Sequence, residues 1–494
     1  MSLKLLRNIV FWSLVFLYLI LAPVISFQAL GYVFEPKSMS FVKTGIISLV
    51  TKPKEASIYL NGGLQKDKTP VAVTRLLPGR YHIDVRLAGY QLWQQEVIIA
   101  AEEVARVEHI LLIPEKPLIT NPVSFPVQFL LPSGEGKFIF LISRESGKIF
   151  VRAFDLRKKR VSFELAETEA RGNKTTAVSL LASSDERRLL ACFKGKSEVP
   201  CVAASLSNDF APVSLSSIMP RSAGNIRFHP KDSKELFYLE DGQLSALSLD
   251  EKTKRPVTLK NVRSFEISGD RIYYFTKDFK LFSSNPEGKD AIDLLPDRGL
   301  RRLLFGEDET NFYRMFFTER ENAFWLRQDG KLLMNRLPYF ADENVKGARL
   351  VPDSESILYW KSKELWLLNL NVSGKHSQEF FEAGSHKTLL WQSKRPIVSA
   401  QMIRGGRYVL IATDRTLSFL ELSMPSPQNH FLIVKHANQR NLSFYLDEEA
   451  GELYWIDRKD KSTFLCSAKI LEPSPLGFSI WFRKPYSSPE WIEL

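Results

Sequence analysis

The sequence predicts an all-β protein that begins with one apolar helix. Three observations support this prediction: an uncharged apolar stretch near the N-terminus, a segment in which apolar and polar residues alternate, and an apolar strand pattern that recurs along the rest of the chain. In chain order they predict a short tail and transmembrane helix over residues 1–34, a small β-sandwich over residues 45–114, and a seven- or eight-bladed β-propeller over residues 118–494.

The predicted helix runs from Ile9 to Leu30 and contains no charged residue. At 1.5 Å per residue it is about 33 Å long, enough to cross the hydrocarbon core of a bilayer. A cleaved signal peptide is the alternative. Cleavage after Ala29 would put the bulky Phe27 where a small side chain is needed, so we expect an uncleaved anchor.

The charges that flank the helix do not fix its orientation. Lys4 and Arg7 precede it, while Lys37 and Lys43 follow closely, so the basic residues are nearly balanced. The short leading tail and the β-rich domains that follow favour a cytoplasmic N-terminus. We therefore expect a single-pass protein of the cell membrane whose C-terminal domains lie outside the cytoplasm.

A compact pattern of strands and turns follows the helix. From Tyr81 to Leu87 the odd positions are apolar and the even positions polar, which is typical of a sheet with one face in water. Asn61-Gly62 is a hairpin-turn dipeptide, and Leu77-Pro78-Gly79 marks a second turn. These features predict the small β-sandwich.

This segment resembles the PEGA domain family, a small β-sandwich module often attached to bacterial and archaeal surface proteins. The tetrapeptide that names the family stands here as Pro53-Lys54-Glu55-Ala56, so its central Glu-Gly is replaced. The resemblance implies extracytoplasmic placement and a structural or adhesive role, with contact with carbohydrate as one form of it, and it brings no catalytic residues. The pieces that carry it are Pro53-x-x-Ala56, Ile58-Tyr59-Leu60-Asn61-Gly62, Thr69-Pro70, Leu77-Pro78-Gly79-x-Tyr81, Gly89-Tyr90 and Trp93.

Three aromatic residues of this segment, Tyr81, Tyr90 and Trp93, are candidate ligand contacts. If they are exposed, their rings can stack on a sugar. If they are buried, they only fill the core or an edge of the sheet. The sequence leaves both interpretations open, and packing is the default.

One pattern recurs after the sandwich: an apolar strand, a charged turn and a second apolar strand. The copies are spaced by about 45 residues on average, the length of a four-stranded propeller blade. Strands such as 357–360 are apolar on both faces, so we expect each sheet to be covered on both sides. The first strands of the copies are Phe138–Leu141, Leu189–Cys192, Leu236–Leu239, Ile272–Phe275, Ala323–Leu326, Ile357–Trp360, Tyr408–Ile411 and Leu453–Ile456.

Several copies follow a turn that carries Pro or Ser-Asp, as in Phe228-His229-Pro230-Lys231-Asp232, Leu350 to Ser354 and Ser183 to Glu186. This combination resembles the TolB-type and broader WD40-like propeller repeats, although no Trp-Asp dipeptide occurs. Eight blades are expected first and seven second. Either the Pro117–Gln128 stretch or the C-terminal tail is expected to close the ring.

Cys192 and Cys201 flank a turn-like stretch and can face each other across a hairpin. They either form a disulfide in an oxidising compartment or are two small buried apolar residues. Cys466 has no evident mate.

The sequence points to binding and not to catalysis. The seven histidines show no zinc-ligand spacing, and no nucleophile elbow, phosphate-binding loop or dinucleotide-binding motif occurs. The net charge of +11 is spread along the chain, so no nucleic-acid partner is expected.

We therefore predict a membrane-anchored cell-envelope protein, without cofactor or catalytic residues, whose propeller binds a protein or a glycan. The alternative is a propeller hydrolase or lyase acting on surface glycans or peptides, with carboxylates drawn from different blades.

Overall fold

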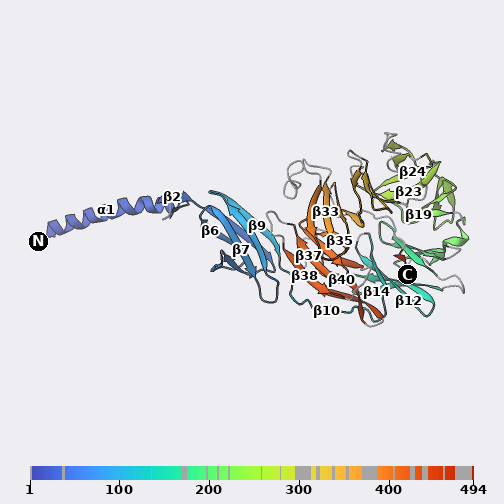
Figure 1. Ribbon diagram of the computed structural model, residues 1–494, viewed down its shortest axis with the longest axis horizontal. Coiled ribbons are helices and arrows are strands. Elements are labelled where there is room, and N and C mark those ends of the chain that lie inside the picture. Colours follow the sequence, from blue (N-terminus) through green and yellow to red (C-terminus); the bar gives the residue numbers. More distant parts are fainter. Residues whose placement is uncertain are drawn as a thin grey trace. The chain divides into compact units, whose positions relative to one another are not determined.

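The computed structural model divides the chain into two compact units (Figure 1). One contains Met1–Lys116 with Ser423–Phe431, and the other contains Pro117–Leu422 with Leu432–Leu494. The structure describes residues 3–29, 31–35, 39–134, 136–168, 175–195, 199–207, 211–220, 223–257, 259–278, 280–294, 313–318, 323–335, 340–351, 355–369, 387–403, 406–422, 429–436, 443–459, 462–472 and 492–493.

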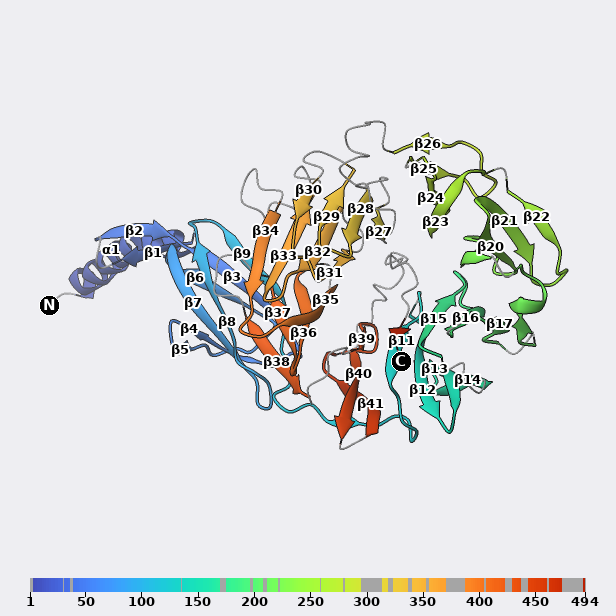
Figure 2. The same cartoon turned by 45° about the vertical axis from the view of Figure 1, so that its right-hand side comes forward.

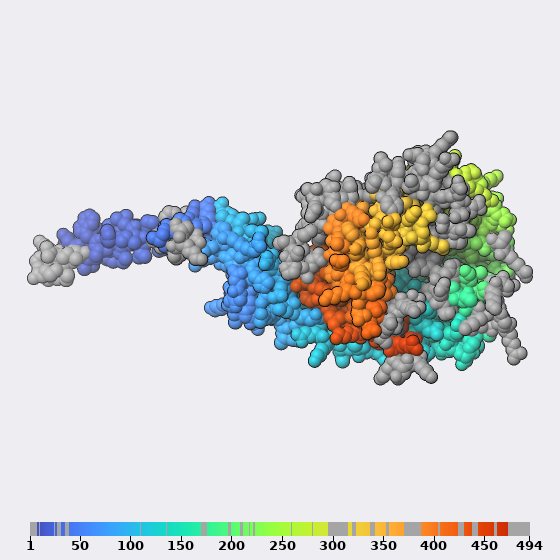
Figure 3. All heavy atoms as spheres, in the orientation of Figure 1, coloured from blue at the N-terminus to red at the C-terminus, as the bar shows by residue number. Residues whose placement is uncertain are grey.

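The first unit begins with helix α1 (Leu3–Ala29), which contains Pro23. It covers the predicted apolar stretch up to Ala29, and Leu30 lies outside the described residues. Large apolar side chains such as Phe11, Trp12 and Tyr18 are exposed on it. Figure 3 draws the described atoms of α1 as dark blue spheres. Within the described part of the chain, no helix is both long enough and apolar enough to cross a membrane.

A short hairpin and two further sheets complete this unit. The hairpin pairs β1 (Tyr32–Glu35) with β2 (Ser40–Lys43). One sheet has the order β6-β3-β9 and the other β5-β4-β7-β8, and β8 lies against β3 and β9. The bounds are β3 (Gly45–Lys52), β4 (Ser57–Leu60), β5 (Gly63–Leu64), β6 (Val71–Leu76), β7 (Gly79–Arg86), β8 (Trp93–Ile99) and β9 (Val104–Leu111).

The turns of this unit lie where the sequence predicts them. The predicted alternation of side chains from Tyr81 to Leu87 holds with one exception. Asn61 and Gly62 both have positive φ (49° and 82°), as the hairpin dipeptide requires. Ile83 and Val85 are fully buried, as predicted. Asp84 was expected in water but is only 7% exposed. The fold tolerates its burial because Arg86 and Gln94 donate hydrogen bonds to its carboxylate.

The second unit contains eight sheets in its described residues, named here blades 1 to 8 in chain order. Blades 1 to 7 each have four strands in sequential order, with a fifth added in blade 2, whereas blade 8 has three consecutive strands and a fourth from elsewhere in the chain, as described below. Blade 1 has β11 (Phe129–Pro132), β12 (Phe138–Glu145), β13 (Lys148–Asp155) and β14 (Arg160–Thr168); blade 2 has β15 (Ala177–Ala182), β16 (Arg188–Lys194), β17 (Cys201–Ser205) and β18 (Val213–Ser214), followed by the 3-10 turn η1 (Leu215–Ser217). Blade 3 has β19 (Gly224–Phe228), β20 (Glu235–Glu240), β21 (Gln243–Ser248) and β22 (Lys254–Pro256); blade 4 has β23 (Val262–Ser268), β24 (Arg271–Thr276), β25 (Leu281–Ser284) and β26 (Ile292–Asp293).

Blades 5 to 8 repeat this arrangement. Blade 5 has β27 (Tyr313–Phe317), β28 (Ala323–Arg327), β29 (Leu332–Met334) and β30 (Phe340–Asp342); blade 6 has β31 (Gly347–Leu350), β32 (Ser356–Trp360), β33 (Glu364–Asn369) and β34 (Lys387–Gln392). Blade 7 has β35 (Ile397–Ile403), β36 (Tyr408–Thr413), β37 (Thr416–Glu421) and β38 (His430–Lys435); blade 8 has β39 (Phe444–Asp447), β40 (Glu452–Lys459) and β41 (Ser462–Lys469). Each of the eight apolar strands in the sequence repeat forms the second strand of one blade.

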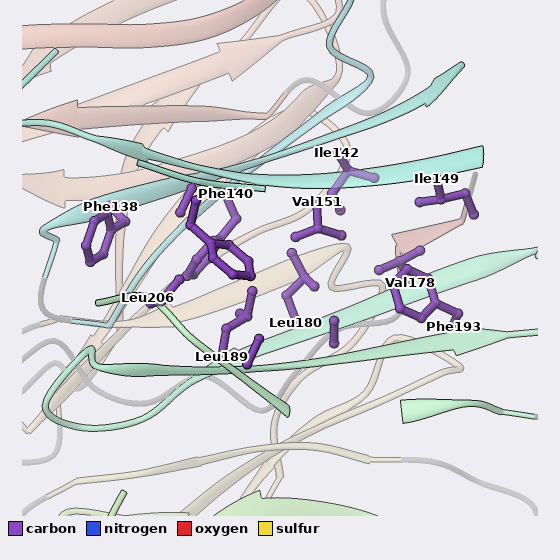
Figure 4. Packing of buried hydrophobic residues seen from close by; sticks show 14 residues of the cluster. Phe138, Phe140, Ile142, Ile149, Val151, Val178, Leu180, Leu189, Phe193 and Leu206 are labelled. Atoms are coloured by element: carbon purple, nitrogen blue, oxygen red, sulfur yellow. The ribbon is translucent and has the colours of Figure 1, made fainter. Parts of the chain in front are cut away.

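Apolar clusters join successive blades, so both faces of a blade are covered, as the two-sided apolar strands predict. Leu236 and Tyr238 of β20 pack with blade 2, whereas Phe237 between them packs with blade 4. Figure 4 shows the cluster between blades 1 and 2, with Phe140 and Ile142 facing Leu180 and Leu189. Because side chains alternate along a strand, each strand contributes to two interfaces.

The blades surround a common centre, toward which their first strands face (Figure 2). The sequence left two candidates for ring closure, and the structure uses the first: β10 (Ile119–Thr120) pairs with β41 as the outer strand of blade 8. The Thr120 and Ser467 hydroxyls are also hydrogen-bonded at 2.9 Å. The C-terminal strand β42 (Ile492–Glu493) pairs instead with β15, on the inner edge of blade 2.

Candidate functional site

The three predicted aromatic contacts do not share one environment. Trp93 is fully buried at the start of β8, where it fills the core, the default interpretation of the sequence. Tyr81 and Tyr90 are half-buried. The Tyr81 hydroxyl donates to the Leu77 carbonyl at 3.0 Å, which fixes the ring near the turn that precedes β7. A sugar contact by Tyr81 or Tyr90 stays a prediction.

A polar cluster around Asp84 lies in the same unit. Its carboxylate accepts hydrogen bonds from Arg86 and Gln94, both at 2.8 Å, and lies 3.0 Å from His82 Nε2. Burial alone would raise the pKa of Asp84, but these hydrogen bonds and charges hold it below its ordinary value. The side chain of Asn429 donates to the Gln94 carbonyl at 2.8 Å. The cluster therefore keeps an ionised carboxylate in place at the sheet.

Cys192 and Cys201 lie directly opposite each other in β16 and β17, and a disulfide joins them with a Cα–Cα distance of 4.1 Å. Cys466 is a buried free thiol whose pKa is raised to about 11, chiefly by burial. A thiol with this pKa stays protonated at neutral pH and is a poor nucleophile.

Blades 2, 3 and 4 form a shallow depression at the turns that join their first and second strands. The empty space at this depression, including the open solvent within it, is about 330 Å³. Among its lining residues, the Arg227 guanidinium donates two hydrogen bonds to Glu266, at 3.0 and 2.9 Å, and the two side chains are only 11% and 6% exposed. The lining residues are Leu181, Ala182, Ser184, Arg227, Phe228, His229, Pro230, Glu266, Ile267 and Gly269.

Hydrogen bonds between blades hold this surface. The Ser184 hydroxyl of blade 2 donates to the Pro230 carbonyl of blade 3 at 2.9 Å, and the Ser233 hydroxyl donates to Asp185 at 2.8 Å. Lys231 of blade 3 forms an ion pair with Asp270 of blade 4 at 3.4 Å. The turns of three blades therefore form one connected surface.

His229 accepts hydrogen bonds in the turn that joins β19 and β20 of blade 3. Its Nδ1 accepts the backbone N–H groups of Lys231 and Asp232 at 3.1 and 3.0 Å. Burial lowers the pKa of His229, so the ring is neutral at physiological pH and Nδ1 remains an acceptor. Among the described residues, no group of three or more His, Cys, Asp or Glu side chains is arranged to hold a metal ion.

A second polar site lies at the centre of the ring, where the first strands of blades 6, 7 and 8 meet. The part-buried guanidinium of Arg349, on β31, donates to Gln401 Oε1 at 3.2 Å and Ser399 Oγ at 3.4 Å, both on β35. Its Cζ lies 6.0 Å from the centre of the Phe444 ring on β39. Sequence patterns could not identify this site, because its residues lie in different copies of the repeat.

Between blades 5 and 6, Asp342 accepts hydrogen bonds from several side chains. Its donors are Tyr359 Oη at 2.8 Å, Lys361 Nζ at 2.9 Å and Lys387 Nζ at 2.5 Å. Burial alone would raise the pKa of Asp342, but the donors lower it to about 2 from the ordinary 3.8. Lys387 also lies over the rings of Tyr359 and Trp366, at 6.0 and 4.6 Å.

This cluster predicts an acid-sensitive propeller. Because the folded-state pKa is depressed, the stabilisation is complete above about pH 4 and is lost as the pH falls toward about 2. A shift of this size corresponds to about 2 kcal/mol. Thermal unfolding between pH 5 and pH 2 should show this loss in the wild-type chain, whereas Asp342→Asn should be less stable at pH 5 and lack this part of the pH dependence. Equal pH dependence in the two proteins would contradict the assignment.

Comparison with protein families matches one segment of the N-terminal unit. Residues 44–111 match the family model described as "PEGA domain". No curated protein matches the chain.

Among solved structures, the chain is similar to the β-propeller domain of Cps50 (Swd1) from Myceliophteria thermophila, with 13% identity, a TM-score of 0.41, and coverage of 71% of this chain and 99% of that one. It is also similar to the computationally designed Ika8 protein (12% identity, TM-score 0.42, 69% of this chain and 95% of that one). A third similar structure is YCF48 from Cyanidioschyzon merolae (9% identity, TM-score 0.37, coverage of 61% of this chain and 97% of that one). At these identities and TM-scores the similarity carries no conclusion about what this chain does or binds.

Proposed function

We propose that this chain is a non-catalytic binding or scaffold protein of the cell envelope, anchored in the membrane by its N-terminal helix. Its propeller presents a rigid surface to a protein or glycan partner. The observation that supports this most directly is the connected surface of blades 2 to 4, whose turns are joined by side-chain hydrogen bonds around a depression. Loops held by a rigid scaffold commonly bind ligands.

The membrane part of the proposal rests on the stretch from Ile9 to Leu30, some of whose side chains lie outside the described ones. The exposure of Phe11, Trp12 and Tyr18 supports it, because apolar side chains around a helix are favourable in lipid and unfavourable in water. The match of residues 44–111 to the PEGA domain supports a role as a spacer or adhesive module.

A topology assay tests the placement. A reporter that is active only outside the cytoplasm, fused after Leu494, should be active, and protease added to intact cells should digest the propeller. If the reporter is inactive and the propeller protected, the envelope placement is wrong, and a cytoplasmic interaction platform replaces it.

Two charges in the middle of α1 should release the chain from membranes. The double variant Leu19→Arg with Ile20→Arg places two guanidinium groups where each costs about 3 kcal/mol in a bilayer. We expect it to move from the membrane pellet to the supernatant on fractionation. Ser40→Arg, outside the apolar stretch, is the control and should stay in the pellet. A double variant that stays there as fully as the control would refute the anchor.

A further inference from the structure

We propose that Arg349 is the central residue of a carboxylate-binding site in the propeller, and that the site takes an acidic side chain from an extended peptide. This inference rests on the proposed binding function and specifies the chemistry of the partner. The evidence is the difference between two equivalent positions in the ring, those of Arg227 and Arg349.

Arg227 and Arg349 occupy the same position in their blades. Each is the next-to-last residue of the first strand, in β19 and β31 respectively. Each reaches the fifth residue of the seven-residue first strand of the next blade, which is Glu266 in β23 and Gln401 in β35.

The two arginines differ in the charge of that partner. Arg227 is neutralised by a bidentate carboxylate, whereas Arg349 contacts an amide oxygen and a hydroxyl, both neutral. None of the acidic side chains in the described ranges forms an ion pair with Arg349. Within the described part of the ring, a counter-ion is therefore present at the first place and absent at the second.

An arginine in this setting favours an anion from outside the ring. Withdrawing a guanidinium from water without a counter-ion is costly, and burial lowers the pKa of Arg349 accordingly. Guanidinium groups bind carboxylates through two parallel hydrogen bonds, as Arg227 does with Glu266. A ligand carboxylate would supply at Arg349 the charge that Glu266 supplies at Arg227.

The C-terminal strand indicates why the ligand is an extended peptide. β42 pairs antiparallel with β15, with Val178 opposite Ile492 and Ala177 opposite Glu493. The inner edge of a first strand therefore accepts an extended segment by main-chain pairing. A peptide can use the same main-chain pairing at the centre of the ring, with an acidic side chain directed to Arg349.

The test uses two fluorescent probes with the full-length chain in a non-ionic detergent: an eight-residue peptide of glutamate and one of glutamine. Fluorescence anisotropy should show tighter binding of the glutamate peptide. Arg349→Gln should weaken that binding at least about 10-fold, because a hydrogen-bonded charge is lost. Gln401→Glu, which installs the carboxylate present at Glu266, should weaken it to a similar extent without lowering the melting temperature.

Arg395→Gln is the matched control, since it removes the same charge from an exposed arginine that pairs with Asp414. It should bind the glutamate peptide like the wild-type chain. If Arg395→Gln loses as much affinity as Arg349→Gln, only the diffuse positive charge is involved and the site is refuted. Absence of binding to the wild-type chain also refutes it. If Arg349→Gln does not fold, the affinity of Gln401→Glu for the glutamate peptide tests the site in its place.

Two further results separate this inference from the proposed function. Arg349-dependent binding of oligogalacturonate, with no binding of the glutamate peptide, would show that the partner is a glycan and that the peptide assignment is wrong. Failure of the peptide experiment leaves the reporter and fractionation results unaffected, because these depend on α1 and the position of Leu494. A cytoplasmic propeller that binds the glutamate peptide through Arg349 would instead refute only the envelope placement.

Discussion

Glu266→Ala is expected to lower the stability of the propeller by about 3–5 kcal/mol. The change leaves the largely buried guanidinium of Arg227 without its bidentate partner, and an uncompensated charge withdrawn from water is among the costliest single defects in a protein. Calorimetry of the full-length chain should show the propeller transition about 4–6 °C lower, given the entropy of unfolding of a unit of this size.

Two further variants identify the cause of this loss. Arg227→Met with Glu266→Leu removes both charges and should recover most of the stability, because an apolar pair of similar volume replaces the ion pair well. Gln401→Ala, at the equivalent place beside Arg349, removes a neutral partner and should cost no more than about 1.5 kcal/mol. If Glu266→Ala costs no more than Gln401→Ala, the charge of Glu266 does not stabilise the ring.

Trp93→Ala is expected to destabilise the N-terminal unit by about 3–5 kcal/mol, the usual range for removing a fully buried tryptophan. The cavity lies where β8 meets the other sheet of the sandwich, so the transition of this unit should shift while that of the propeller stays in place. Calorimetry that resolves two transitions checks the result.

Tyr90→Ala provides the comparison for this variant. Tyr90 is half-buried, so its loss should cost clearly less stability than the loss of Trp93. A Trp93→Ala protein with unchanged stability and reduced binding to a polysaccharide would support the sugar-contact interpretation and contradict the burial of the ring.

The blades were predictable because their signal is local and repeated. In each copy a run such as Ile357–Trp360 is apolar at consecutive positions. This pattern is expected of a strand whose two faces are both covered. Recurrence at the length of a blade then implied a ring, and each run proved to be the second strand of a blade.

The parts that the sequence did not resolve depend on long-range pairing. Ile119 and Ala468 are opposite each other, although no local pattern links them. The difference between Glu266 and Gln401 has meaning only after the register of the first strands is known. Trp93 was ambiguous because β8 begins Trp-Gln-Gln-Glu, a run that does not alternate clearly enough to show which face is buried.

The closure of blade 8 by β10 also constrains how the protein is made. The two residues of β10 leave the ribosome early, but their partners in β41 follow about 350 residues later. At a typical synthesis rate of roughly 5–20 residues per second, this interval lasts about 17–70 s. Throughout it, the nascent ring has unpaired strand edges that can bind other chains. Production of this protein should therefore depend on the supply of chaperones more strongly than its final stability suggests.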